Sequence, residues 1–304
     1  LSSSSAASDV YKRQVINQFN LVLSNSLELK NYNYTIEANL NSFKFKPNKK
    51  IKNDFLKKDI KQVFFEKTKI KADLSKANKK RTVDVNGFYK TNNDDKFKEF
   101  KVQNSFNKNS LNFNLNLDFD NKINFDLINY YKNNNIIGNI KAEISVFKNK
   151  TVIKKILFKE KKNNILIKGL ELNKNNSIKK FKKLTVKTYA NGKINNDFII
   201  ILGKKIIING DMFDSTNLIK KIDSKSENSV LANISKDIQV NFKDVLTKWS
   251  IPIKDFNLIG KIEKGKIVKL SSKSEFSENE FLDISLKKEF MSNKKILEIY
   301  SDIP

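Results

Sequence analysis

The side chains of this chain that could do chemistry are carboxylates, lysines and tyrosines. The 304-residue sequence has no histidine and no cysteine, which excludes His-based acid/base pairs, thiolate metal sites and Ser/His or Cys/His nucleophile systems. Acidic groups occur at Asp94-Asp95, Asp118, Asp120 and Glu278-Asn279-Glu280. A carboxylate-based hydrolase could use such acids, but adjacent acidic residues are typical of exposed turns, and no Gly-rich loop accompanies them. The sequence therefore predicts no catalytic residue, no metal site and no cofactor.

The elements that position these residues are predicted by a nearly regular alternation of apolar and polar residues between Leu111 and Leu127. Side chains on a strand point alternately to opposite faces, so one face here is apolar and the other is rich in Asn and Asp. We interpret 111–119 and 123–127 as the two strands of a hairpin. The residues assigned to its apolar face are Leu111, Phe113, Leu115, Leu117, Phe119, Ile123, Phe125 and Leu127. Such a sheet is half of a sandwich, part of a closed sheet, or the lining of a groove.

Strand-like stretches recur along the rest of the chain at a spacing of about ten residues, which is typical of all-β folds. Asn191-Gly192 and Gly203-Lys204-Lys205 are predicted hairpin turns. One or two short helices are also predicted, one over Asp214 to Ile222 and a second over Asn53 to Phe65, where a strand is the alternative. Before the first of these helices, Gly210 is expected to allow a turn. Asp214 or Ser215 is expected to cap the helix. The pattern predicts an all-β, antiparallel meander.

The chain shows no interior domain boundary. Residues 1–14 differ in composition from the rest and resemble the translated adapter tails of assembled reads, so we exclude them from fold reasoning. Residues 15–304 are then one continuous β segment, with no Pro-rich or Ser-rich linker. Because no initiator Met is present, we expect an internal fragment of a longer protein, with any membrane anchor outside it. No window of eighteen apolar residues is present that could span a bilayer as a helix.

The formal net charge is +26, and Arg13 and Arg81 are the only arginines. A positive field of this kind suits anionic surfaces in general. A nucleic-acid-binding protein is one alternative, but no recognisable binding motif is present, and Arg, the preferred residue for phosphate and base contacts, is nearly absent. We therefore expect no nucleic-acid partner.

The order of short motifs in residues 195–304 resembles the AsmA-like superfamily, in particular its YhdP branch. Ile208-Asn209-Gly210-Asp211-Met212-Phe213-Asp214 precedes a predicted apolar helix, and Leu258-Ile259-Gly260-Lys261-Ile262 leads into Gly265-Lys266-Ile267 and Leu270. A later strand ends Leu297-Glu298-Ile299-Tyr300-Ser301-Asp302. Members of that branch carry a G-x-x-x-D step after a strand, a G…G-x-I hairpin and a strand closing in S-D.

The resemblance implies an elongated, curved β-sheet with an apolar groove, along which phospholipids pass across the periplasm from an inner-membrane anchor toward the outer membrane. Phospholipids and the two membranes are then the expected partners, and outer-membrane assembly is the expected role. From the strand pattern alone a sandwich core is the commoner outcome, whereas the resemblance favours the groove. An outer-membrane or other envelope β-structural protein and a basic nucleic-acid-binding protein stay open as alternatives.

Overall fold

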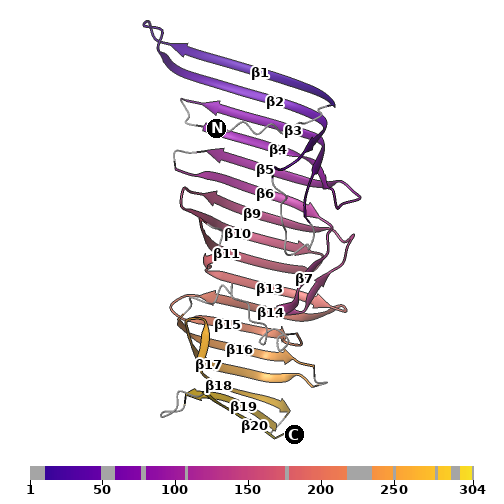
Figure 1. The fold of residues 1–304 in the computed structure, drawn as a ribbon, viewed down its shortest axis with the longest axis vertical. Coiled ribbons are helices and arrows are strands. Elements are labelled where there is room, and N and C mark those ends of the chain that lie inside the picture. Colours follow the sequence, from indigo (N-terminus) through magenta and orange to yellow (C-terminus); the bar gives the residue numbers. More distant parts are fainter. Residues whose placement is uncertain are drawn as a thin grey trace. The chain divides into compact units, whose positions relative to one another are not determined.

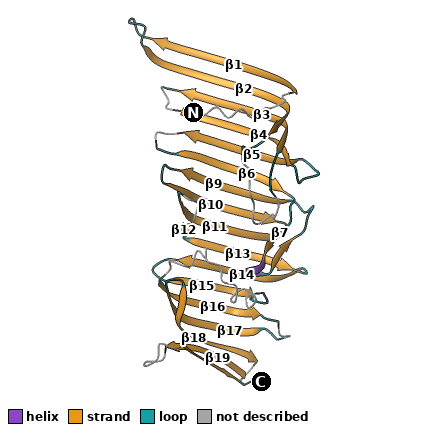
Figure 2. Ribbon diagram, viewed as in Figure 1, coloured by secondary structure: helices purple, strands orange, loops and turns teal. Residues whose placement is uncertain are grey.

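The fold was obtained as a computed structural model, which describes residues 11–48, 59–76, 80–106, 109–174, 178–217, 235–248, 251–277, 280–288 and 295–302. The described residues form an all-β protein with one short 3-10 turn and no α-helix (Figure 2). None of them belongs to a helix long and apolar enough to cross a bilayer. The chain divides into two compact units. Unit 1 comprises Leu1–Ile123 and Lys132–Glu160, and unit 2 comprises Asn124–Tyr131 and Lys161–Pro304.

Unit 1 is one antiparallel sheet in which consecutive strands lie side by side (Figure 1). Its strands, in spatial order, are β1 Tyr11–Leu23, β2 Leu29–Phe45, β3 Val63–Ser75, β4 Lys80–Thr91, β5 Lys98–Phe106, β6 Leu111–Phe119, β9 Gly138–Val146 and β10 Lys150–Glu160. Strand β1 begins inside the segment that the sequence assigns to a tail, and Tyr11 pairs with Ser42.

The strands of unit 2 also pair with their neighbours in chain order, apart from the short β12, and the described strands of both units are counted in one 18-stranded sheet. The strands of unit 2 are β11 Asn163–Asn173, β12 Ile178–Lys180, β13 Lys183–Ala190, β14 Lys193–Leu202, β15 Ile206–Asp214, β16 Lys236–Leu246, β17 Ile253–Glu263, β18 Lys266–Ser277, β19 Glu280–Lys288 and β20 Lys295–Ser301. Strand β12 pairs with β11 beside β13. The antiparallel expectation fails at one place, since β15 and β16 are parallel. A parallel return requires a long connection, and residues 215–235 supply it.

The predicted hairpin between 111–119 and 123–127 is wrong. Strand β6 pairs with β5 and β9, whereas β7 (Ile123–Phe125) pairs with β8 (Tyr130–Lys132) in a separate two-stranded ribbon. The 3-10 turn η1 (Asp126–Ile128) joins the two ribbon strands. The chain thus leaves the sheet after β6 and returns to it at β9. The alternating pattern correctly identified β6 as a strand but did not identify β9 as the strand that pairs with it.

Two predicted turns are confirmed. Asn191 and Gly192 join β13 to β14 with φ values of 51° and 79°, the left-handed conformation that this pair tolerates. Gly203 and the two residues after it join β14 to β15. The predicted helix after Asp214 lies outside the described residues from 218 onward, and Asp214 itself ends β15. Of the predicted helix over 53–65, only 59–65 is described, and strand β3 begins there at Val63.

Gly210 does not form a turn, contrary to the prediction, because it lies inside β15. Phe198 is its neighbour on β14 and Phe242 its neighbour on β16. A Cβ atom at Gly210 would overlap with Phe198 Cβ and with the carbonyl oxygen of Asp197. The missing side chain lets the Phe198 and Phe242 rings approach to 5.8 Å between centroids, in an edge-to-face arrangement. Gly210 therefore serves close packing of aromatic rings.

Candidate functional site

An aliphatic row crosses all eight strands of unit 1. Each member pairs directly with the next across the sheet, so all of them share one face. The members are Val15, Ala38, Ile70, Val85, Val102, Leu115, Ala142 and Ile156. With neighbouring strands about 4.8 Å apart, the row is about 34 Å long. We call the face that carries it the apolar face of unit 1.

The opposite face is polar along the adjacent row. Seven consecutive strands contribute a polar residue there, each paired with the next. These residues are Glu37, Lys71, Asp84, Gln103, Asn114, Glu143 and Lys155. Lys71 and Glu37 form an exposed ion pair of 2.6 Å. The two faces therefore differ sharply in polarity, which specifies the register of every strand pair.

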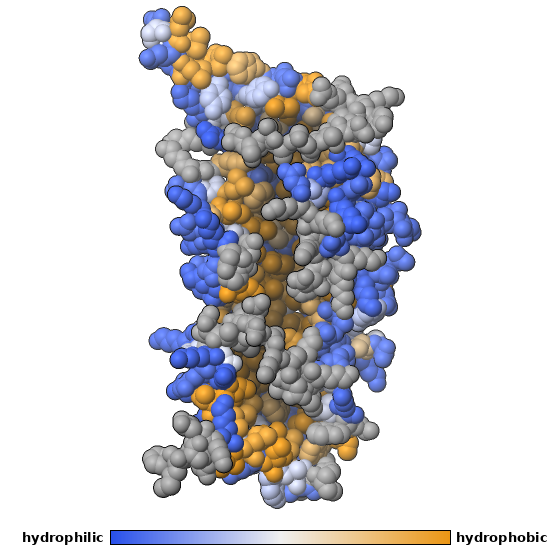
Figure 3. All heavy atoms as spheres, viewed as in Figure 1, coloured by the Kyte–Doolittle hydropathy of each residue, from blue (hydrophilic) through white to orange (hydrophobic). Residues whose placement is uncertain are grey.

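No described strand covers the apolar face of unit 1 as a second layer. The strands of unit 1 lie side by side in one layer (Figure 1), and each makes its extensive backbone contacts with its neighbours in the sheet. In the aliphatic row, Leu115, Val102 and Val85 are half-buried, Val15 is exposed and Ala142 is buried. Figure 3 shows hydrophobic residues along the middle of the strands and hydrophilic residues toward the strand ends. Contiguous apolar surface of this extent is typical of interaction sites.

Five of the eight residues predicted for the apolar face lie together on it. Leu111, Phe113, Leu115, Leu117 and Phe119 all point to one side of β6. The other three do not extend the stripe. Ile123 and Phe125 lie in the ribbon strand β7, and Leu127 lies in η1 with 54% of its surface exposed. Their alternation continues beyond β6, but the chain has already left the sheet.

Unit 2 also has an apolar face, centred on a cluster of aromatic and aliphatic side chains. Its buried members are Val186, Phe198, Val240, Phe242, Val245, Ile253, Phe276 and Leu282. Phe213 stacks on Phe242 with 5.2 Å between ring centroids. Ile128, from η1, packs against the edge of this cluster. The aromatic part of this face surrounds the position of Gly210.

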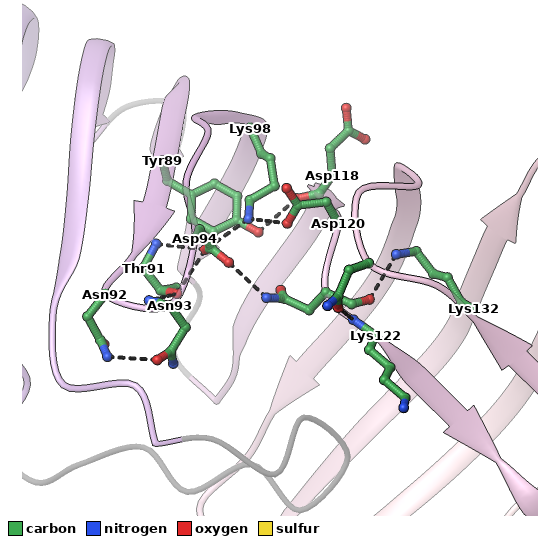
Figure 4. A network of polar contacts seen from close by, with 12 residues as sticks. Tyr89, Thr91, Asn92, Asn93, Asp94, Lys98, Asp118, Asp120, Lys122 and Lys132 are labelled. Atoms are coloured by element: carbon green, nitrogen blue, oxygen red, sulfur yellow. Dashed lines mark hydrogen bonds and ion pairs between the residues drawn. The ribbon is translucent and has the colours of Figure 1, made fainter.

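A buried polar network lies at one end of β4, β5 and β6 in unit 1 (Figure 4). Lys98 points between two carboxylates, with its Nζ 2.8 Å from Asp94 and 2.7 Å from Asp120. The side chains of Lys98 and Asp94 are 4% and 1% exposed. Tyr89 donates a hydrogen bond of 2.7 Å to the carbonyl oxygen of Asp118.

Burial and hydrogen bonding oppose each other in this network. Burial alone would raise the pKa of Asp94, but hydrogen bonds from Lys98, Thr91 and Asn121 outweigh burial and hold that pKa below its ordinary value. Burial, reinforced by the neighbouring carboxylates, raises the pKa of Tyr89. These shifts are those of a structural ion-pair network, in which the charged form of Asp94 is stabilised by donors.

The predicted acidic groups are therefore partly brought together. Asp94 and Asp120 share Lys98, whereas the Asp118 carboxylate accepts a hydrogen bond of 2.6 Å from Asn139. Glu278 lies outside the described residues. Among the described residues no three metal-binding side chains gather into a possible metal site. The sequence did not identify Lys98 as their shared partner: Asp94 is only four residues before Lys98, but Asp120 lies beyond β5 and β6.

A second buried polar network fixes the end of β15 in unit 2. The Asp214 carboxylate accepts hydrogen bonds from Asn129 at 2.9 Å and from Asn195 at 3.3 Å, and Thr216 donates to its other oxygen at 2.6 Å. Asn196, which is fully buried, donates to the Ile128 carbonyl at 2.6 Å. Asp214 thus joins β14, β15 and the segment after η1.

The helix that Asp214 or Ser215 is predicted to cap lies outside the described residues from 218 onward, and the described contact of Ser215 is with a neighbouring strand. The backbone N–H and the hydroxyl of Ser215 both donate to the carbonyl oxygen of Leu246, at 2.9 and 2.8 Å. This double contact ties the end of β15 to the end of the parallel strand β16. The Asp214 side chain, in turn, is buried and accepts hydrogen bonds from Asn129, Asn195 and Thr216.

We expect Thr188→Val to lower the free energy of unfolding of unit 2 by about 1–2 kcal/mol. Thr188 is fully buried, donates to Asn195 at 2.8 Å and accepts from Asn196 at 2.9 Å. Valine keeps the shape but removes the donor to Asn195 Oδ1 and the acceptor of one Asn196 N–H, while both amides keep their other hydrogen bonds. Urea denaturation checks this, with Thr185→Val, on the opposite face of the same strand, as the control. Equal losses from the two substitutions would contradict a role for the network.

Comparisons with known proteins do not identify a family, since no family model, no curated protein and no solved structure matches this chain. The observed fold, the two polarity-segregated faces and the two buried networks are thus the basis for assigning a function. The resemblance to the AsmA-like superfamily stays a prediction from sequence.

Proposed function

We propose that this chain is a non-enzymatic carrier of phospholipids, and that the acyl chains lie on the apolar face of unit 1. The supporting observation is the aliphatic row, which crosses eight strands without a described layer above it. Aliphatic side chains offer no polar atoms that would hold a headgroup in place. Lipids can therefore bind at many equivalent positions and move between them.

The energetics favour acyl chains as the occupant. Two acyl chains contain about thirty methylenes, so exposing them to water costs more than about 20 kcal/mol, at about 0.8 kcal/mol each. An apolar face removes much of this penalty and leaves the headgroup in water. The process makes and breaks no covalent bond and so requires no catalytic residue.

The resemblance of residues 195–304 to the AsmA-like superfamily leads us to extend the proposal. We propose that the sheets line an elongated, curved apolar groove and that lipid passes along it across the periplasm, between the inner and outer membranes, in support of outer-membrane assembly. The open apolar face of unit 1 is compatible with such a groove, because a lipid-conducting surface has to stay free of a covering layer.

The decisive experiment is lipid analysis of the purified full chain by mass spectrometry. We expect phospholipid to co-purify, and Leu115→Asp to reduce the bound lipid about threefold or more, because a carboxylate on this face must be desolvated by the acyl chains. Leu115 lies between Val102 and Ala142 in the aliphatic row. Other parts of the face keep some lipid, so the loss is partial.

The matched control is Asn116→Asp, which adds a charge on the exposed, polar face of the same strand. It should keep the wild-type lipid load, and circular dichroism should show that both variants retain the sheet. Wild-type protein that is folded and free of lipid would contradict the proposal, as would equal lipid loss in the two variants.

A further inference from the structure

Six lysines surround a pocket of about 1130 Å³ at one margin of unit 2. They are Lys204, Lys236, Lys261, Lys264, Lys266 and Lys295. Asp237 and Glu263 are the acidic residues that line the same pocket, so positive charge is in excess. We call these six residues the lysine cluster. A concave surface that concentrates one sign of charge attracts ligands of the opposite sign.

The topology of unit 2 brings the cluster together. Lys204 lies in the turn before β15, and Lys236 is the first residue of β16. Because β15 and β16 are parallel, their first residues lie at the same margin of the sheet (Figure 1). Lys264 lies in the turn between β17 and β18, and Lys266 and Lys295 begin β18 and β20. The parallel pair, absent from a simple meander, is therefore what collects these lysines.

Half of the ammonium groups in the cluster are already engaged. Lys236 donates to the carbonyl oxygen of Gly203, Lys295 donates to that of Ile267 at 2.7 Å, and Lys261 pairs with Glu263 at 2.7 Å. The other three, Lys204, Lys264 and Lys266, are exposed, and their ammonium groups have no hydrogen bond or ion pair with any described residue. The ammonium groups of these three lysines are therefore available to pair with an anionic ligand.

The cluster adjoins the apolar face of unit 2. Lys236 and Ile238 point to the same side of β16, two residues apart, and the alternation continues with Val240 and Phe242. Lys236 is also paired with Ile262, which is buried. Apolar side chains and ammonium groups therefore lie next to each other at this margin. This arrangement is complementary to a phospholipid, in which apolar acyl chains adjoin a negatively charged headgroup.

We propose that the lysine cluster binds the phosphate of an anionic phospholipid headgroup while the acyl chains of that lipid lie on the adjacent apolar face of unit 2. This inference rests on the proposed function and adds a selection for headgroup charge. Lysines are point charges without the fixed fork of arginine, so they select net negative charge and leave the headgroup structure free. A phosphate in free solution offers the same charge, and the test separates the two sources.

The test uses the full chain and lipid vesicles of two compositions, phosphatidylcholine alone and phosphatidylcholine with one fifth phosphatidylglycerol. After incubation at low salt, mass spectrometry measures the ratio of the two lipids extracted by the protein. We expect wild-type protein to enrich phosphatidylglycerol over its share in the vesicle. The variant Lys204→Glu/Lys264→Glu/Lys266→Glu should lower that enrichment about tenfold or more, since each lysine near an anionic headgroup contributes severalfold.

The matched control is Lys101→Glu/Lys141→Glu/Lys159→Glu, which makes the same change in net charge at exposed positions on the polar face of unit 1. It should keep the wild-type enrichment. Circular dichroism verifies that both triple variants are folded. An equal loss in the control would overturn the inference, because net charge alone would then explain the preference.

The remaining outcomes separate this inference from the proposed function. Extraction of the two lipids by wild-type protein in the same ratio as in the vesicle would overturn the headgroup selection and leave the carrier function supported. No extraction of either lipid would overturn both. Calorimetry with glycerol phosphate provides the second arm. Binding of glycerol phosphate that the cluster variant abolishes, together with no enrichment of phosphatidylglycerol, would show a site for free phosphate and overturn the lipid assignment.

Discussion

Lys98→Met is expected to lower the free energy of unfolding of unit 1 by about 3–5 kcal/mol at pH 7. The ammonium group is almost fully buried between Asp94 and Asp120, so removing it leaves two carboxylates without their shared counter-charge. Methionine keeps most of the length of the side chain, which separates the loss of charge from the creation of a cavity. Denaturation followed by hydrogen exchange in β4, β5 and β6 measures the effect.

The pH dependence supplies a second readout. Because the pKa of Asp94 is lowered in the folded wild-type protein, its contribution to stability is present above the ordinary Asp pKa of about 3.9 and is lost as the pH falls through the lowered value. Without Lys98, burial raises that pKa, so folding then favours the protonated acid. The stability that the variant loses relative to the wild type should therefore be smaller at pH 4.5 than at pH 7.

Lys101→Met is the control for this experiment, since Lys101 is exposed on the opposite face of β5. It should change stability by less than about 0.5 kcal/mol. A loss from Lys98→Met that is small, or that is the same at both pH values, would show that the ion pair does not stabilise unit 1.

Gly210→Ala is expected to destabilise unit 2 by about 3 kcal/mol. The added methyl group would overlap with Phe198 Cβ and with the Asp197 carbonyl oxygen, and its Cβ would lie 2.8 Å from Phe198 Cα. Backbone atoms cannot move aside as a flexible side chain can, so β14 and β15 would have to separate. Hydrogen exchange of the β14 and β15 amides, compared with urea denaturation, locates the damage.

The same substitution at Gly203 is the matched control. An alanine Cβ at Gly203 would meet only the Lys205 carbonyl oxygen, at 3.8 Å, an ordinary contact. Gly203→Ala should therefore change stability by less than about 0.5 kcal/mol. If both alanine variants are equally stable, close packing at Gly210 is not what requires glycine there.

Local sequence signals predicted local structure well. The alternation from Leu111 to Phe119 predicted the correct face of β6, and Asn191-Gly192 predicted the correct turn. These predictions succeed because strand periodicity and positive φ depend on neighbours in sequence. The all-β class followed from the repetition of such signals along the chain.

Features that depend on distant pairing were not predictable in this way. The alternation of Ile123 and Phe125 matches that of β6, yet only the pairing of β6 with β9 shows that they have left the sheet. Glycine is typical of turns, so the sequence around Gly210 predicted a turn. Its actual role in ring packing depends on Phe198 and Phe242, which lie on two other strands. The same holds for the pairing of Lys98 with Asp120, which follows β6, whereas Asp94 is only four residues before Lys98.

The contrast between the two faces of unit 1 has a consequence for how this sequence can vary. One aliphatic residue can replace another in the row without altering either surface. Gain or loss of a single residue within a strand, however, would turn every side chain beyond that point to the other side, setting Glu37 or Asp84 among hydrocarbon and Ala38 or Val85 in water. Length changes within these strands are therefore confined to pairs of residues, or to the turns between strands.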